Sequence, residues 1–176
     1  MEKLVNKSNE NLELINNANL IITALDILNS KFSGKTVLIT GAAGFLGCQF
    51  VYYFDLLNSL KINEKPTKVY LWDNFIRGIP AWMNNFTSKK NFFVETKDII
   101  IDCDYPNTNY IIHAASIASP IFYRKYPLET IFSKITGLKN LLDFSINNKN
   151  IDSVLFFSTS EIYGDPDSKN IPTKET

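Results

Sequence analysis

The sequence has two cysteines and one histidine among its 176 residues. Cys48 and Cys103 lie far apart and lack metal-ligand spacing, so we expect no metal site and no disulfide framework. Two reduced, partly buried thiols are the expectation, which fits a cytoplasmic protein. No cationic stretch precedes an apolar block, and the longest apolar candidate, residues 20–28, is interrupted by Thr23 and Asp26. We therefore expect neither a signal peptide nor a membrane span.

An excess of charge of either sign is also missing. Lys plus Arg number 18 and Asp plus Glu number 18, and no long basic run occurs. We therefore expect no nucleic-acid partner and no binding to an anionic membrane surface. With 45% apolar and 20% charged residues, the chain has the composition and length of about one ordinary globular domain.

What the sequence does contain is a glycine-punctuated stretch, TVLITGAAGFLG, at residues 36–47. A short apolar run ending in glycines predicts a buried parallel strand that turns sharply into a helix. Such a turn can bind a pyrophosphate: Gly41 permits the tight turn, Gly44 lets the backbone approach the phosphates, and Gly47 lets the helix pack close to the strand. The alternative is a turn that uses glycine only for its conformational freedom.

An acidic residue follows the next predicted strand. Residues 69–72 (VYLW) predict this strand, which ends at Asp73. Such a residue is the expected partner of the adenosine ribose hydroxyls, and its charge disfavours a 2′-phosphate, which favours NAD over NADP. Arg77 weakens the preference, because guanidinium groups often bind that phosphate. A solvated or capping aspartate is the alternative.

Strand and helix patterns alternate along the rest of the chain. Further strands are predicted at residues 91–95, 110–113 and 154–157, and the spacing of Ile131, Ile135, Leu138 and Leu142 predicts a helix over residues 127–147. This alternation predicts an α/β fold, a doubly wound Rossmann-like parallel sheet with helices on both faces. Ligands bind outside the carboxyl ends of such strands, so residues that follow different strands should form one site.

The residues around the predicted fourth strand are expected to differ in role. Ala114, Ala115 and Ser116 follow the strand, and their small side chains leave room for a flat ring. His113, the single histidine, ends the strand and is expected to be a packed, hydrogen-bonded residue rather than a base.

Residues 1–33 are predicted to be a helical extension that precedes a domain at residues 34–176. Leu12, Ile15, Ile21 and Leu28 have roughly helical spacing. One or two amphipathic helices should pack on the flank of the domain or on another subunit. A partly ordered tail is the alternative.

These motifs together resemble the extended short-chain dehydrogenase/reductase superfamily, from Lys35 to about Thr176. The resemblance is carried by a glycine loop with G-x-x-G-x-x-G spacing and four further motifs in the same order: Asp73-Asn74-Phe75, Asp98-Ile99, His113-Ala114-Ala115-Ser116 and Ser158-Thr159-Ser160-Glu161-Ile162-Tyr163-Gly164. Two segments look most like UDP-glucuronate decarboxylases: Ala118-Ser119-Pro120 with Tyr123, and Thr159-Ser160-Glu161 with Gly164-Asp165-Pro166. Sugar-nucleotide 4,6-dehydratases typically have Asp at the place of Ser160, which favours decarboxylation or epimerisation here.

The resemblance implies NAD as cofactor and a nucleotide sugar, such as a UDP-sugar, as substrate. It implies pyrophosphate contacts from Gly41, Gly44, Phe45, Leu46 and Gly47; adenosine ribose contacts from Asp73 and Asn74, with Phe75 beside them; adenine contacts from Asp98 and Ile99; and nicotinamide contacts from Ala114, Ala115 and Ser116. It implies catalytic roles for Thr159, Ser160 and Glu161, and substrate contacts from Ser119 and Tyr123. For residues 158–161, a polar strand end that caps a turn is the alternative. A homodimer through the helix at residues 127–147 is also implied.

The sequence departs from the superfamily in two ways. No lysine has a tyrosine four residues before it, so the catalytic Tyr-x-x-x-Lys pair is expected beyond Thr176. The chain should then be an N-terminal portion, with a sheet incomplete at its C-terminal end, that binds NAD weakly and does not turn over. The predicted long helix also has Lys134 and Leu138 where the superfamily has Asn and Thr.

Three interpretations remain open from the sequence. The chain is part of a UDP-glucuronate decarboxylase-like enzyme, part of a 4-epimerase or 4,6-dehydratase acting on another nucleotide sugar, or a non-catalytic Rossmann module that binds nucleotide or a partner chain.

Overall fold

The computed structural model describes residues 2–101 and 104–175, without the side chains of residues 2–11 and of Ser160. Cys103, one of the two predicted thiols, lies outside the described residues. Five parallel strands form one sheet: β1 (Thr36–Thr40), β2 (Lys68–Asp73), β3 (Phe92–Thr96), β4 (Tyr110–His113) and β5 (Ser153–Phe156). Their order is β3-β2-β1-β4-β5. The chain therefore reverses direction across the sheet between β1 and β4, the place where doubly wound sheets bind ligands.

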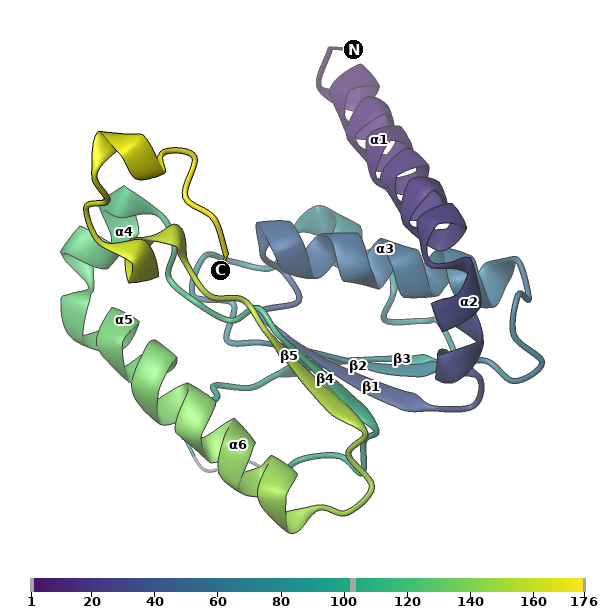
Figure 1. Ribbon diagram of the computed structural model, residues 1–176. Helices are drawn as coiled ribbons and strands as arrows, with labels where there is room; N and C mark the ends of the chain where they lie inside the picture. The colour runs from purple at the N-terminus through teal and green to yellow at the C-terminus, as the bar shows by residue number, and fades with distance from the viewer. Residues whose placement is uncertain (1, 102–103, 176) are drawn as a thin grey trace.

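Helices cover both faces of the sheet, which confirms the predicted α/β class. The helix α3 (Phe45–Ser59) lies over one face (Figure 1). A long helix lies over the other face and consists of α5 (Pro127–Phe132), the π-helical turn η3 (Ser133–Gly137) and α6 (Leu138–Asn147). Shorter elements are η2 (Ala81–Asn85), α4 (Pro120–Lys125), η4 (Ser160–Tyr163) and η5 (Ser168–Asn170).

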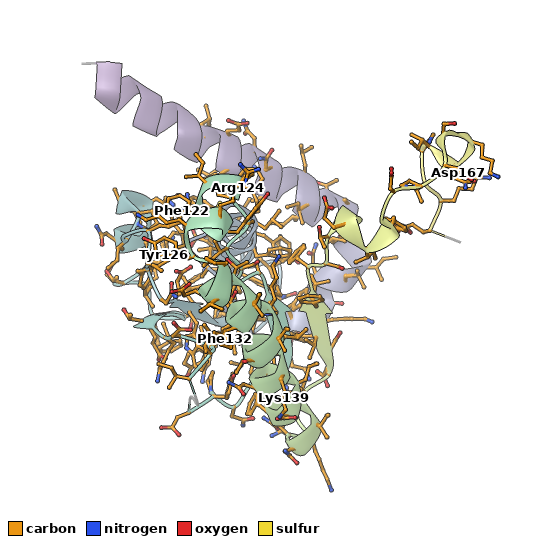
Figure 2. The ribbon with its side chains drawn as sticks, turned by 90° about the vertical axis from the view of Figure 1, so that its left-hand side faces the viewer. Phe122, Arg124, Tyr126, Phe132, Lys139 and Asp167 are labelled. Atoms are coloured by element: carbon orange, nitrogen blue, oxygen red, sulfur yellow. The ribbon has the colours of Figure 1, made fainter. Side chains whose placement is uncertain are left out.

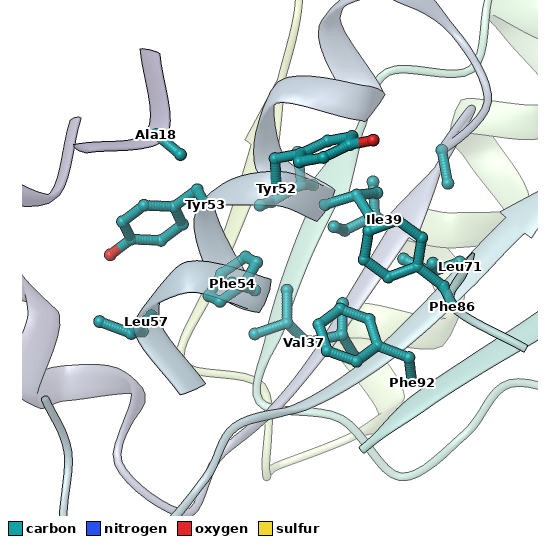
Figure 3. Close-up of a cluster of buried hydrophobic side chains, with 14 of the residues drawn as sticks. Ala18, Val37, Ile39, Tyr52, Tyr53, Phe54, Leu57, Leu71, Phe86 and Phe92 are labelled. Atoms are coloured by element: carbon teal, nitrogen blue, oxygen red, sulfur yellow. The ribbon is translucent and has the colours of Figure 1, made fainter. Parts of the chain in front are cut away.

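Successive side chains of a strand point to opposite faces of the sheet, so the core consists of two clusters, one on each face. Val37 and Ile39 of β1 face α3, where they are fully buried with Phe54 and Leu71 (Figure 3). Leu38 points to the opposite face and packs with Leu141 of α6. Because β1 is buried on both faces, its sequence is a continuous apolar run rather than an alternating one.

The N-terminal segment forms the predicted helices, although only part of the predicted set of residues packs. They are α1 (Glu2–Ala24), α2 (Asp26–Asn29) and the short η1 (Ser30–Phe32), and α1 lies against α3 and projects beyond it (Figure 1). Ala18 is buried there, with Leu14, Ile21 and Ile22 packed around it. Of the residues used for the prediction, Leu12 and Leu28 are largely exposed. Among the described residues, no helix is long and apolar enough to cross a bilayer.

The N-terminal helices are fastened to the domain by a buried asparagine. Asn29 is 2% exposed, and its Oδ1 accepts a hydrogen bond from the Tyr53 hydroxyl of α3 at 2.7 Å. Its Nδ2 donates to the carbonyl of Ile22 at 2.9 Å, while its own carbonyl accepts from Asn63 Nδ2 at 2.9 Å. Burial raises the pKa of Tyr53 to about 12, so this hydroxyl stays protonated and donates. The junction between the N-terminal helices and the sheet domain therefore includes a specific polar contact at Asn29 of α2, beside the apolar packing of α1.

The predicted helix at residues 127–147 is present, and its apolar stripe faces outward. Ile131, Ile135 and Leu142 of this stripe are 50%, 65% and 41% exposed, and its fourth member, Leu138, is half-buried. The face turned to the sheet carries small residues and a leucine: Thr130, Ser133, Gly137 and Leu141. The stripe that predicted the helix is thus not the surface that the helix buries within this chain.

Candidate functional site

A cavity of about 390 Å³ lies beside the carboxyl ends of the central strands. It brings together predicted residues that follow β1, β2, β3 and β4 along the chain. The predicted cofactor residues that line it are Gly41, Gly44, Asp73, Asn74, Asp98, Ile99, Ala114, Ala115 and Ser116, and the predicted substrate residue is Ser119. Most of the predicted site residues therefore lie together at the carboxyl ends of the strands, as expected from the sequence.

Two glycines of the loop are required by the fold itself. Gly41 has φ +71°, and a Cβ on it would lie 2.5 Å from the backbone nitrogen of Ala115. A Cβ on Gly47 would lie 2.1 Å from the carbonyl oxygen of Gly41. The first position needs glycine for its left-handed conformation, and the second for the close approach of α3 to β1.

Gly44 differs, because it leaves space on the cavity side. A Cβ there would have one neighbour within 4 Å, the Gly41 carbonyl oxygen at 3.1 Å. Gly44 is the N-cap residue of α3, and this helix start has no side-chain cap hydrogen bond and no acidic residue in its first turn. The first N–H groups of an α-helix have no partner within the helix, and they carry the positive end of its dipole. This end of α3 is therefore suited to an anion.

Asp73 connects the second strand to the glycine loop. Its Oδ2 accepts a hydrogen bond from the backbone N–H of Ala43 at 3.0 Å, and its Oδ1 accepts from Phe75 N–H at 2.9 Å. An ionised carboxylate has about four acceptor positions, so these two bonds leave capacity for ligand hydroxyl groups. The same two bonds orient the carboxylate at the cavity wall.

The ends of β2 and β3 are joined across the same wall. Asn74 Nδ2 lies 3.2 Å from Asp98 Oδ2, and Asp98 Oδ1 accepts from the backbone N–H of Ile100 at 3.0 Å. The Asn140 side chain donates to the carbonyls of Ile99 and Ile100 at 3.0 and 3.2 Å. Helix α6 therefore positions the loop that carries Asp98 and Ile99.

Gly137 allows that helix to approach. A Cβ on it would lie 2.6 Å from Cδ1 of Ile99. It ends the π-helical turn η3, a type of irregularity that is frequent at functional sites. Neither Gly137 nor Asn140 was predicted as a site residue. The available signal was Gly137 itself, a glycine inside a strongly helical pattern.

His113 lies beneath the glycine loop and has the packed role that was expected. It is 2% exposed, its Nδ1 is 2.6 Å from Thr40 Oγ1, and its ring stacks on Phe156. Burial lowers the pKa of His113 to about 4, so the imidazole is neutral at pH 7. The adjacent Ala114 N–H donates to the Thr40 carbonyl at 2.9 Å. The pair fixes the carboxyl ends of β1 and β4 relative to each other.

Other predicted residues lie outside the cavity wall. They are Phe45, Leu46, Gly47, Phe75, Tyr123, Thr159 and Glu161, while the side chain of the predicted Ser160 lies outside the described part of the structure. Phe45 is 83% exposed, and Phe75 packs against the α3 core instead. Thr159 and Glu161 are exposed after the end of β5, where Thr159 Oγ1 accepts from the Glu161 N–H at 3.3 Å. The capping arrangement named as the alternative is thus present at this strand end.

The cavity also has walls that sequence reasoning did not assign. The loop after β2 contributes Arg77 and its neighbours, and the loop after β3 contributes Lys97. Phe122 of α4, Tyr126 between α4 and α5, and Glu129 of α5 also line it. In the described part of the chain, no group of three or more histidine, cysteine, aspartate or glutamate side chains is arranged to hold a metal ion.

The strand order, the glycine turn into α3 and an acidic residue after β2 define a Rossmann-like nucleotide-binding fold. The chain belongs to the NAD dependent epimerase/dehydratase family, whose sequence pattern matches residues 37–176.

Similar proteins agree with this assignment. The chain is 34% identical over 141 residues to UDP-glucuronic acid decarboxylase 6 of Arabidopsis thaliana, and 32% identical over 139 residues to UDP-glucuronic acid decarboxylase 1 of Danio rerio. Each match covers 78% of this chain, but only 38% and 30% of the respective relative. The chain thus spans less than half the length of the curated relatives it matches.

Solved structures show the same fold. A UDP-N-acetylglucosamine 4-epimerase from Methanobrevibacter ruminantium M1 superposes with a TM-score of 0.59 and 28% identity, covering 81% of this chain and 43% of the epimerase. A dTDP-glucose 4,6-dehydratase from Streptomyces venezuelae, solved with NAD bound, gives a TM-score of 0.63 at 22% identity, with 76% and 42% coverage. The latter identity supports a shared fold only.

Proposed function

We propose that this chain is the NAD-binding part of a nucleotide-sugar-modifying enzyme, most similar to UDP-glucuronate decarboxylases. The observation that carries the proposal is that Gly44, the N-cap residue of α3, and Asp73 meet at one cavity. In this proposal residues 34–176 are the cofactor domain and residues 1–33 are a helical extension.

The cavity suggests a place for each part of the dinucleotide. The N-terminus of α3 and Gly44 would hold the pyrophosphate, and Asp73 would accept hydrogen bonds from the adenosine ribose. Asp98 and Ile99 would border the adenine. The small residues Ala114, Ala115 and Ser116 would border the nicotinamide. When bound, NAD in such enzymes accepts a hydride from C4 of the sugar and later returns it.

A test of the cofactor proposal is calorimetric titration of the protein with NAD⁺ and with NADP⁺. We expect NAD⁺ to bind more tightly, because the Asp73 carboxylate repels a 2′-phosphate. Asp73→Ser should reduce this preference, and Asp167→Ser at the N-cap of η5, outside the cavity wall, is the matched control. Equal affinities of the wild type for both dinucleotides would contradict the role of Asp73.

We place the sugar near residues 159–161, Ser119 and Tyr123. Thr159 would hydrogen-bond the hydroxyl to be oxidised, and Glu161 would handle charge or a proton near C5. Oxidation at C4 makes the C5 carboxylate of UDP-glucuronate part of a β-keto acid, which loses CO₂ readily. The similarity to decarboxylases and the serine at position 160 support this substrate over those of the dehydratases.

The substrate proposal is tested with the protein encoded by the complete reading frame. Incubation with NAD⁺ and UDP-glucuronate should release CO₂ and yield a UDP-pentose. In parallel incubations with UDP-glucose, epimerisation at C4 would instead identify a 4-epimerase, and loss of the C6 hydroxyl as water to give a 4-keto-6-deoxy product would identify a 4,6-dehydratase. Either result would overturn the decarboxylase proposal while retaining the family.

We further propose that the exposed stripe of the α5–α6 helix pairs with its counterpart in a second copy. Ile131, Ile135 and Leu142 form an apolar row, and neighbouring Leu128 and Ile146 are 63% and 81% exposed. Contiguous apolar patches of this kind mark interfaces. Light scattering should give a dimer for the wild type and a monomer for Ile135→Glu. A monomeric wild type at micromolar concentration would contradict the proposal.

We also propose that the protein acts in the cytoplasm. Cys48 is a buried thiol, with Sγ 3.1 Å from the Phe45 carbonyl oxygen, and burial raises its pKa. A reducing compartment keeps such a thiol intact. Cell fractionation tests the assignment, and recovery in a membrane or secreted fraction would contradict it.

A further inference from the structure

The cavity is bordered by two segments that come from distant parts of the sequence. One is the loop at residues 74–80, after β2, and the other is α4 with the start of α5. Along the run of helices from α4 to α6, Phe122 and Tyr126 lie at one end and Lys139 lies toward the other (Figure 2). The Arg77 guanidinium carbon lies 5.5 Å from the centre of the Phe122 ring, within cation–π range. The two walls therefore meet at this pair.

The loop is anchored at its start, where Asn74 Nδ2 lies 3.2 Å from Asp98 Oδ2 and Phe75 packs against the α3 core. Beyond that start it is loosely tied: residues 76–79 are exposed, and the hydrogen bonds are local, from Ile76 N–H to Asn74 Oδ1 at 3.1 Å and from Gly78 N–H to the Phe75 carbonyl at 2.7 Å. Gly78 has φ +85° and no neighbour within 4 Å of its ideal Cβ position. None of the six residues of α4, all of which are described, is buried. Segments with few buried contacts open at low free-energy cost.

We propose that Arg77 and Phe122 form a clasp across the cofactor cavity, which must open for the dinucleotide to enter and leave. The inference rests on the proposed NAD site. Both residues line the cavity, so their contact forms part of the wall around a ligand inside it. An arginine suits this role because its planar guanidinium stacks on an aromatic face while its charge remains near the ligand phosphates. Arg77 and Phe122 are thus positioning residues that set the exchange rate of the cofactor.

The test is a double-mutant cycle on NADH release, measured by stopped-flow displacement with excess NAD⁺. Arg77→Gln and Phe122→Leu should each speed release, by about three- to tenfold, because each removes one partner of a cation–π pair. In the Phe122→Leu background, Arg77→Gln should add little. Arg124→Gln, a cation loss on α4 outside the cavity wall, should leave the rate unchanged.

The outcomes separate the clasp from the proposed function. Fully additive effects of the two substitutions would overturn the clasp, because they would mean that Arg77 and Phe122 contact the cofactor independently. A wild type that binds no NADH would overturn the cofactor proposal itself, and with it the clasp. Unchanged melting temperatures of the single variants exclude a general loss of structure, since Arg77 is exposed and Phe122 is half-buried.

Discussion

The buried histidine gives a quantitative prediction for how stability depends on pH. Because burial lowers the pKa of His113 from 6.5 to about 4, the folded protein keeps it neutral where the unfolded chain binds a proton. The unfolded state then binds more protons, so stability falls as pH decreases. The loss begins near pH 6.5 and ends near pH 4, where the folded protein also becomes protonated.

The expected magnitude is large for a single side chain. One pKa unit corresponds to 1.36 kcal/mol, so the change in the pKa of His113 corresponds to a loss of roughly 3 kcal/mol between pH 7 and pH 4. His113 is 2% exposed, so little of this loss is offset by solvent. For a domain that is stable by about 5–15 kcal/mol, such a loss is easily measured.

Urea denaturation at a series of pH values, with His113→Asn as the control, measures the effect. The asparagine keeps a polar atom near Thr40 Oγ1 but cannot take up a proton. Its free energy of unfolding should start lower, because volume is lost beside Phe156, and should fall less steeply below pH 6.5 than that of the wild type. Parallel curves for the two proteins between pH 7 and pH 4 would refute the reasoning.

Three further substitutions test contacts that hold the fold together around the glycine loop, the N-terminal helices and α6. Gly47→Ala should cost about 2 kcal/mol or more, because its Cβ would lie 2.1 Å from the Gly41 carbonyl oxygen, and an unchanged urea midpoint would refute this close approach. Asn29→Ala should cost about 2 kcal/mol, because it removes the acceptor of the Tyr53 hydroxyl, and proteolysis should then remove the N-terminal helices more readily; equal protease resistance would count against the junction. Leu141→Ala should cost 2–5 kcal/mol in thermal denaturation, since Leu141 is fully buried, and a loss below 1 kcal/mol would show that α6 is poorly packed.

The fold was predictable because local patterns and global topology agree. The apolar run of β1 and the glycines after it predict a buried strand and a tight turn, and both are present. The fourth strand, Tyr110–His113, was predicted with its bounds, because a short apolar run there is followed directly by small residues. Asp73 was predicted at the cavity because a parallel sheet gathers the ends of its strands.

What could not be predicted depends on partners that are distant in the sequence. The spacing of Ile131, Ile135 and Leu142 specifies a helix but not which surface covers its apolar face. In the fold, Gly137 and Ser133 face inward because Ile99 needs the space, so the stripe turns outward. A periodic apolar pattern predicts a helix but does not predict which surface packs against it.

The cavity wall illustrates the same limit. No local signal connects Arg77 with Phe122, because their contact depends on where the loop after β2 and helix α4 meet. Conversely, Thr159 and Glu161 follow β5 as predicted and still lie outside the cavity wall. The order of the motifs predicts which residues follow the carboxyl ends of the strands. The paths of the loops then decide which of those residues reach the cavity.

The central claim, that the N-terminus of α3 binds the pyrophosphate of NAD, is tested most directly at Gly44. Its φ of −78° is open to other residues and aspartate is a favourable N-cap, which should offset the 3.1 Å contact of a Cβ with the Gly41 carbonyl oxygen, so Gly44→Asp should fold with a melting temperature close to that of the wild type. Its carboxylate would occupy the phosphate position and repel the ligand. Calorimetric titration should therefore give saturable NAD⁺ binding for the wild type and none for Gly44→Asp. Equal binding by the two proteins would contradict the account.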